Sequence, residues 1–162
     1  MTPKINQKIC FGLDNRVCIV AGGAQGIGQA CAERLAREGA YIVLADVDDA
    51  KGQALAEELQ ATCVNCDVGD KRQVDALVAR TFARHGRIDV LVNNAGIFKA
   101  ADFLDVTEAD FDAMLRVNLK GAFLVGQAVA REMAKTGDGS IVNMSSVNGV
   151  LAIPIIASDN VS

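Results

Sequence analysis

The chain has 162 residues, of which 51% are hydrophobic and 22% are charged, and its formal net charge is −4. So much apolar content with so little net charge excludes a disordered protein, and an acidic balance without a Lys/Arg cluster argues against nucleic-acid binding. The apolar runs are far shorter than the roughly 20 residues of a membrane span, and the first dozen residues lack the apolar core of a signal peptide, so we expect a cytoplasmic protein.

Short apolar segments alternate with amphipathic ones along most of the chain. Apolar runs predict strands at 17–21, 41–45, 62–66, 88–92 and 141–144. Helical periodicity predicts helices at 26–38 and 48–59, a third around 74–82, and a long one at 107–135 that Thr107 could cap. Such an alternation is typical of a parallel sheet with helices on both faces.

We therefore predict a single α/β domain over 1–162, in three layers, with a doubly wound parallel sheet of about five strands. About 1–12 would be an N-terminal extension and 147–162 an irregular tail. Ligands of such sheets bind beyond the carboxyl ends of the strands, which directs attention to the residues that follow each one.

A glycine-rich turn follows the first predicted strand. Gly22, Gly26 and Gly28 lie where this strand meets the first helix, and glycine there lets the backbone approach a ligand closely. The first N–H groups of the helix could then bind a diphosphate, with Gln25 and Ile27 in the same turn. A tight turn without a ligand also uses glycine, but the strand before it and the helix after it favour phosphate binding.

Asp46 ends the second predicted strand, where a carboxylate can accept hydrogen bonds from both hydroxyls of an adenosine ribose. Its charge would repel the 2′-phosphate of NADP, and neither Gln25 nor Val47 offers a cation for that phosphate. We therefore predict NAD as the cofactor in preference to NADP. The alternative is a solvated carboxylate at a strand end.

Five cysteines, an odd number in a chain without a signal peptide, indicate free thiols. Cys63 and Cys66 form a C-x-x-C pair, which fits redox chemistry or half of a zinc site. Zinc would need two more ligands, and His85 is the only histidine. A redox pair is expected at a helix N-terminus, whereas this one lies in a predicted strand. We favour a structural role and predict no metal site.

Four motifs together resemble the short-chain dehydrogenase/reductase family. They are Gly22-x-x-x-Gly26-x-Gly28, Cys66-Asp67-Val68, Asn93-Asn94-Ala95-Gly96 and Ile141-Val142-Asn143-Met144-Ser145-Ser146. The resemblance extends from about Gly12 to the last residue and implies a Rossmann-like fold. A methyltransferase, the main alternative, shares the glycine turn and the strand-end acid but lacks the Asn-Asn-Ala-Gly motif.

The resemblance also implies roles for residues around the cofactor. Asp67 would accept a hydrogen bond from the adenine amine, and Val68 would pack on the adenine ring. Asn94, Ala95 and Gly96 would form the turn beside the nicotinamide ribose. The implied reaction is hydride transfer between the nicotinamide and a small-molecule secondary alcohol or ketone, with no nucleic-acid or membrane partner.

The catalytic part of the pattern departs from the family. Asn118 matches the asparagine that anchors a proton-relay water, and Ser146 matches the serine that orients the substrate carbonyl. However, Asp159 occupies the position of the family's catalytic Tyr, and the Lys four residues later would fall just beyond Ser162. A carboxylate is mostly ionised at neutral pH and donates a proton poorly. We expect impaired catalysis; the alternative is a non-catalytic NAD-binding or subunit-interaction module.

The resemblance further implies two strands and a long helix after the fifth predicted strand, and the sequence lacks them. Without them, 141–144 would be an exposed apolar edge of the sheet, which favours pairing with other chains. Apolar positions on the long helix would lose part of their cover, among them Phe111, Leu115, Phe123 and Val129. We therefore expect self-association.

Overall fold

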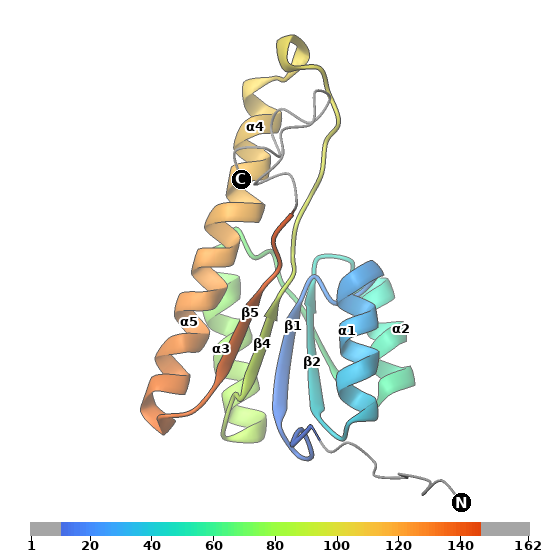
Figure 1. Cartoon of the computed structure of the whole chain (residues 1–162), viewed down its shortest axis with the longest axis vertical. Helices are drawn as coiled ribbons and strands as arrows, with labels where there is room; N and C mark the ends of the chain where they lie inside the picture. The colour runs from blue at the N-terminus through green and yellow to red at the C-terminus, as the bar shows by residue number, and fades with distance from the viewer. Residues whose placement is uncertain (1–10, 147–162) are drawn as a thin grey trace, which may run out of the picture.

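The computed structural model describes residues 11–146, which place five parallel strands in one sheet (Figure 1). The strands are β1 Val17–Ala21, β2 Tyr41–Asp46, β3 Thr62–Asn65, β4 Val90–Asn93 and β5 Ser140–Asn143. Their order is β3-β2-β1-β4-β5, all pairs being parallel. β2 and β3 are added on one side of β1, and β4 and β5 are then added on its other side. The predicted doubly wound α/β fold is confirmed, with the order reversing between β1 and β4.

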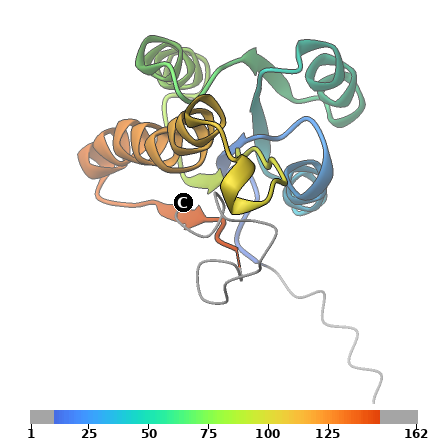
Figure 2. The same cartoon turned by 90° about the horizontal axis from the view of Figure 1, so that it is seen from above.

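The side chains of β1 alternate between two apolar clusters, which explains the layers of helices. Ile19 and Ala21 pack in the cluster that also contains residues of α3 (Lys71–His85) and α5 (Ala122–Thr136). Cys18 and Val20 pack on the opposite face with residues of α1 (Gly26–Arg37) and α2 (Asp49–Leu59). Figure 2 shows these helix pairs on either side of the sheet. Because both faces are covered, the strand is apolar along its whole length.

The predicted helix at 107–135 is one continuous helical stretch whose hydrogen-bonding period changes in the middle. It begins with α4 (Glu108–Met114), continues as the π-helical segment η2 (Leu115–Gly121) and ends with α5. Thr107 caps it as expected, its Oγ1 accepting a bond of 3.1 Å from the N–H of Asp110. The stretch extends past the ends of the strands (Figure 1). A π-helical segment is rare and frequently lies at a functional site.

The two cysteines of the C-x-x-C pair face opposite layers. Cys63 packs beside α2, where a Cβ on Gly52 would lie 2.6 Å from its Sγ, whereas Cys66 belongs to the cluster of α3 and α5. Residues three apart on an extended chain point in opposite directions, so this pair is not arranged for an intramolecular disulfide. Burial raises the pKa of both thiols, that of Cys66 to about 11, which keeps them protonated.

The described sheet has two edge strands, β3 and β5, and β5 pairs with β4 alone among residues 11–146. Its Val142 is 50% exposed, as expected for an uncovered edge. On the long helical stretch, Phe111 and Phe123 are exposed, but Val129 is fully buried against the sheet.

Within the described part of the chain, no helix combines the length and apolar character needed to cross a membrane. The expected tail at 147–162 lies outside the described residues, as does most of the N-terminal extension.

Candidate functional site

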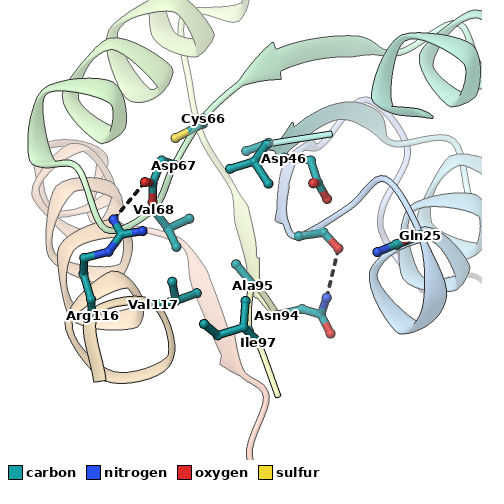
Figure 3. Close-up of a pocket in the computed structure, with 14 residues that line it drawn as sticks. Gln25, Asp46, Cys66, Asp67, Val68, Asn94, Ala95, Ile97, Arg116 and Val117 are labelled. Atoms are coloured by element: carbon teal, nitrogen blue, oxygen red, sulfur yellow. Dashed lines mark hydrogen bonds and ion pairs between the residues drawn. The ribbon is translucent and has the colours of Figure 1, made fainter. Parts of the chain in front are cut away.

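Two adjoining hollows open near the carboxyl ends of the strands, around the reversal of strand order. The first has a volume of about 380 Å³ and the second about 440 Å³. Most residues predicted to bind the cofactor line the first hollow, namely Gly22, Gln25, Asp46, Asp67, Val68, Asn94, Ala95 and Gly96 (Figure 3). The second hollow shares Asn94, Ala95 and Gly96 with the first and adds Ile27, Asn118 and Ser146. The loop after β4 is thus the wall common to both.

Glycine is needed for a different structural reason at each of three positions in the first turn. Gly22 has a φ of 68°, and a Cβ there would lie 2.7 Å from the Cα of Ala95. A Cβ on Gly28 would lie 2.0 Å from the carbonyl oxygen of Gly22. Gly26 has a φ of 59°, and its missing Cβ would meet nothing within 4 Å. Gly22 and Gly28 therefore allow the turn to close on itself and on the β4 loop, whereas the backbone at Gly26 stays open to a ligand.

The N-terminus of α1 lacks the side-chain cap that α2 and α3 have. Asp48 and Asp70 cap α2 and α3, their carboxylates accepting from backbone N–H groups at 3.1 Å and 2.9 Å. Gln25, at the start of α1, makes no such side-chain bond, and no acidic residue occupies the first turn. The first N–H groups of a helix have no partners within the helix and carry partial positive charge. With the open backbone at Gly26, this end of α1 fits a diphosphate.

Asn94 ties the glycine turn to the loop after β4. Its Nδ2 donates a 3.0 Å hydrogen bond to the carbonyl oxygen of Gly22 (Figure 3). Its backbone N–H donates to the carbonyl of Ala21 at 3.2 Å. The preceding Asn93 is buried and donates to the carbonyl of Ala122 at 2.8 Å and to Oδ1 of Asn143 at 3.0 Å. The two asparagines therefore hold the common wall to β1, α5 and β5.

Asp46 is half-buried at the end of β2, and backbone donors fix both of its oxygens. Oδ2 accepts from the N–H of Ala24 at 2.9 Å, and Oδ1 accepts from the N–H of Asp48 at 3.0 Å. An ionised carboxylate has about four acceptor positions, so these two bonds leave capacity for ribose hydroxyls. The carboxylate is thus oriented before a ligand arrives.

Two cations at the site were not identified in the sequence. Arg116, from η2, forms an ion pair of 2.8 Å with Asp67, whose other oxygen accepts from the N–H of Gly69 at 2.8 Å (Figure 3). Lys51, from the first turn of α2, donates to Oε1 of Gln25 at 2.7 Å. Gln25 and Val47 carry no charge themselves, but Lys51 brings a cation to the Gln25 side chain. Lys51 follows the helix cap Asp48 by three residues, a spacing that indicates their ion pair but not the contact with Gln25.

Asn118 lies in η2 and fixes the other end of the common wall. Its Oδ1 accepts from the N–H of Ile97 at 2.8 Å, and its Nδ2 donates to the carbonyl of Ile97 at 3.0 Å. This reciprocal pair holds the chain just after Gly96 against the long helical stretch. Ser146 lines the same hollow from the segment after β5. Asp159, the remaining predicted site residue, lies outside the described residues.

Known proteins share this arrangement of strands and motifs. A family model for short chain dehydrogenases matches residues 16–158. Oxidoreductase UcpA of Salmonella typhimurium is 44% identical over 142 residues, which cover 85% of this chain and 54% of that protein. D-threitol dehydrogenase of Mycolicibacterium smegmatis is 39% identical over 148 residues, covering 88% and 57%. The crystal structure of gox2181 matches with a TM-score of 0.89 and 35% identity, over 91% of this chain and 61% of that one. The chain thus spans little more than half the length of these curated relatives.

Proposed function

This chain belongs to the short-chain dehydrogenase/reductase family, and from that premise we propose that it binds NAD across the two hollows. The adenosine would lie in the first hollow, with its ribose on Asp46 and its adenine beside Asp67 and Val68. The nicotinamide would lie in the second hollow, beside Asn118 and Ser146. Members of this family use nicotinamide cofactors; the preference for NAD over NADP is our proposal and rests on the charge of Asp46.

The observation that carries this proposal is the start of α1. An uncapped helix N-terminus and an open backbone at Gly26 lie in one turn of chain, and the N–H of Ala24 in that turn fixes the carboxylate of Asp46. A diphosphate needs the first two features, and a ribose diol needs the third. The hydrogen bonds of Asn94 and Asn118 hold the loop that forms the wall common to the two hollows.

The proposed reaction class is oxidation of a secondary alcohol or reduction of a ketone. When bound, the nicotinamide would accept or donate the hydride. Ser146 would donate a hydrogen bond to the substrate oxygen and so orient it, while Asn118 would hold the loop at Ile97 in place. D-threitol dehydrogenase, a relative, is named for an alcohol, which supports this class of substrate.

A second candidate function, NAD binding with little or no turnover, is favoured by Asp159. By resemblance this residue occupies the position of the phenol that exchanges a proton with the substrate oxygen. An ordinary aspartate has a pKa near 3.9, against about 10 for tyrosine, so at neutral pH it would hold no proton to donate to a ketone. We therefore propose that hydride transfer by this chain is impaired.

Calorimetric titration of NAD into the purified chain tests the binding proposal, with circular dichroism to show that the protein is folded. We expect saturable binding of one NAD per chain. A folded protein that takes up no NAD would contradict the proposal.

Fluorescence of the reduced nicotinamide, followed with a panel of secondary alcohols, then separates the two candidate functions. Ordinary dehydrogenase rates, from protein free of host enzymes, would exclude the non-catalytic one.

Arg116→Ala should weaken NAD binding about two- to fivefold, because the carboxylate of Asp67 would lose the partner that orients it toward the adenine amine. The small size follows from the exposure of the pair, since such ion pairs contribute about 0.5–1 kcal/mol. Titration of NAD carrying hypoxanthine in place of adenine provides the check, because that base lacks the amine. Arg116→Ala should bind this hypoxanthine analogue as tightly as the wild type does. Arg131→Ala, an exposed control on α5, should change the affinity for neither NAD nor the analogue. An equal loss for both nucleotides would show that Arg116 acts on the fold instead.

A further inference from the structure

Lys51 joins the two turns that form the ribose end of the first hollow. Its Nζ lies 2.7 Å from Oε1 of Gln25 in the glycine turn and 3.0 Å from Oδ2 of Asp48 at the cap of α2. Asp46 connects the same two turns, since it accepts from the backbone N–H groups of Ala24 and Asp48. Asp46 and Gln25 both line the hollow, and the Lys51 ammonium contacts the hollow through Gln25.

We infer that Lys51 reduces the preference for NAD set by Asp46, because it places a positive charge beside the adenosine ribose, so that the site also binds NADP, more weakly than NAD. The inference rests on the proposed function, in which Asp46 receives the ribose hydroxyls. A phosphate on the 2′-oxygen would lie next to Asp46 and toward the Gln25 side chain, within the range of the Lys51 ammonium. Gln25 adds a donor, because its Oε1 faces Lys51 and its NH2 group can face a phosphate oxygen.

The charges around this edge set the direction of the preference. Asp46 and Asp48 outnumber Lys51, so a dianionic phosphate is still disfavoured relative to a hydroxyl. The side chain of Lys51 is 56% exposed and its partner Asp48 is 35% exposed. An ion pair so accessible to water is weak, and the ammonium can leave Asp48 for a phosphate at little cost. The hydrogen bond from Lys51 also lowers the pKa of Asp48, in agreement with the contact.

The test compares nucleotides that differ only in the 2′-phosphate, NAD with NADP and 5′-AMP with adenosine 2′,5′-bisphosphate. Each is titrated into the wild type, Lys51→Met and Lys51→Arg. Lys51→Met should weaken binding of NADP and the bisphosphate about tenfold and leave NAD and 5′-AMP within twofold. Lys51→Arg keeps the charge and should retain NADP affinity. In the wild type, added salt should weaken NADP binding more than NAD binding.

Lys71→Met is the matched control. Lys71 also lies in the first turn of a helix, is 56% exposed and pairs with an aspartate, Asp75. Its partner Asp75 does not line the first hollow, whereas Gln25, the partner of Lys51, does. Lys71→Met should leave the affinities for NAD, NADP, 5′-AMP and adenosine 2′,5′-bisphosphate unchanged. Equal losses of NAD and NADP in Lys51→Met would overturn the inference, because they would indicate damage to α2. NAD binding without NADP binding in the wild type would also overturn it and leave the proposed function intact. If the folded wild type did not bind NAD, both the inference about Lys51 and the proposed function would be contradicted.

Discussion

Replacing Gly28 by alanine should raise the Kd for NAD at least about 30-fold and lower the free energy of unfolding by about 2–3 kcal/mol. The added Cβ would lie 2.0 Å from the carbonyl oxygen of Gly22 and 2.7 Å from Nδ2 of Asn94. Because the first of these atoms belongs to the backbone, no rotamer change can relieve the contact. The turn must open, and the hydrogen bond between Asn94 and Gly22 must lengthen or break.

The matched control for this substitution is Gly126→Ala. Gly126 also lies inside a helix, α5, but a Cβ there would meet only Nδ2 of Asn93, at an ordinary 3.9 Å. Alanine should therefore increase stability by up to about 1 kcal/mol, through helix propensity, and leave NAD affinity unchanged. Urea unfolding and calorimetric titration of both variants measure the two effects. If Gly28→Ala bound NAD as tightly as the wild type, the closed turn would not be the diphosphate site.

The residues found by sequence reasoning are those whose role is encoded locally. The glycines of the first turn follow the apolar strand β1, and Asp46 is the last residue of β2 after an apolar run, so the end of each strand could be read directly. β1 has the bounds predicted for it because all five of its residues are buried. Arg116 and Lys51 could not be found in this way. Arg116 acquires its role from Asp67, and Lys51 acquires its role from Gln25. Each partner lies on another element and comes close only when the chain folds.

The π-helical segment was missed for a related reason. Apolar residues continue at helical spacing through 107–135, and one wider turn around Asn118 does not interrupt that pattern. The predicted strand at 88–92 begins two residues before β4. Ile88 is buried before the strand begins, in the apolar cluster of α3 and α5, and Asp89 is buried in a charged cluster at the amino end of the sheet.

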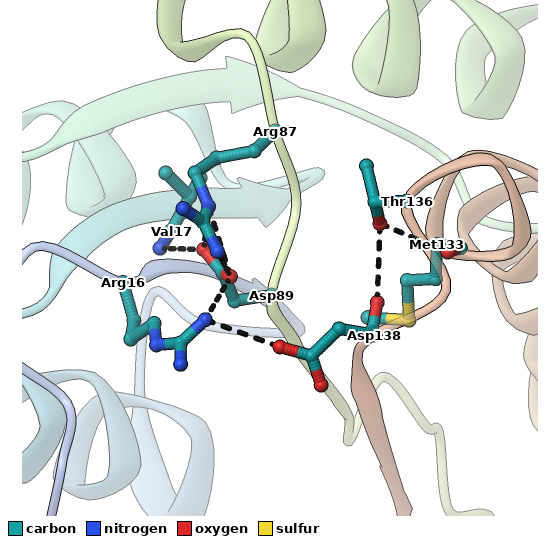
Figure 4. Close-up of polar contacts among 7 residues, drawn as sticks. All are labelled: Arg16, Val17, Arg87, Asp89, Met133, Thr136 and Asp138. Carbon is teal, nitrogen blue, oxygen red and sulfur yellow. Dashed lines mark hydrogen bonds and ion pairs between the residues drawn. The ribbon is translucent and has the colours of Figure 1, made fainter.

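That cluster is centred on Asp89, and Asp89→Asn should lower the free energy of unfolding by about 2–3 kcal/mol at neutral pH. Asp89 is 6% exposed. Its carboxylate accepts from the N–H of Val17 at 2.8 Å, from Arg16 at 2.8 Å and from Nε of Arg87 at 2.9 Å (Figure 4). Arg16 also reaches Asp138, before β5, at 3.3 Å. Asparagine has the same shape, but it carries no charge and turns two donors toward groups that are themselves donors.

Asp75→Asn serves as the control, because it removes another aspartate that forms an ion pair. Asp75 is 53% exposed in its pair with Lys71, so the substitution should cost less than about 0.5 kcal/mol. NAD affinity should be unchanged in both variants while they are folded, since Asp89 lies at the end of the sheet away from the two hollows. Loss of NAD affinity in folded Asp89→Asn would show that the two ends of the sheet are coupled.

The dependence of stability on pH identifies the charge of Asp89 as the cause. Burial disfavours its ionised form, but hydrogen bonds from Arg87, the N–H of Val17 and Arg16 outweigh that effect and lower the pKa below its usual value. A group with a lowered pKa stabilises the fold fully above its unfolded pKa of about 3.9, and this stability is lost as the pH falls through the folded value. The wild type should therefore lose stability below about pH 4, and Asp89→Asn should lose less over the same range. Parallel curves for the two proteins would assign the acid sensitivity to other carboxylates.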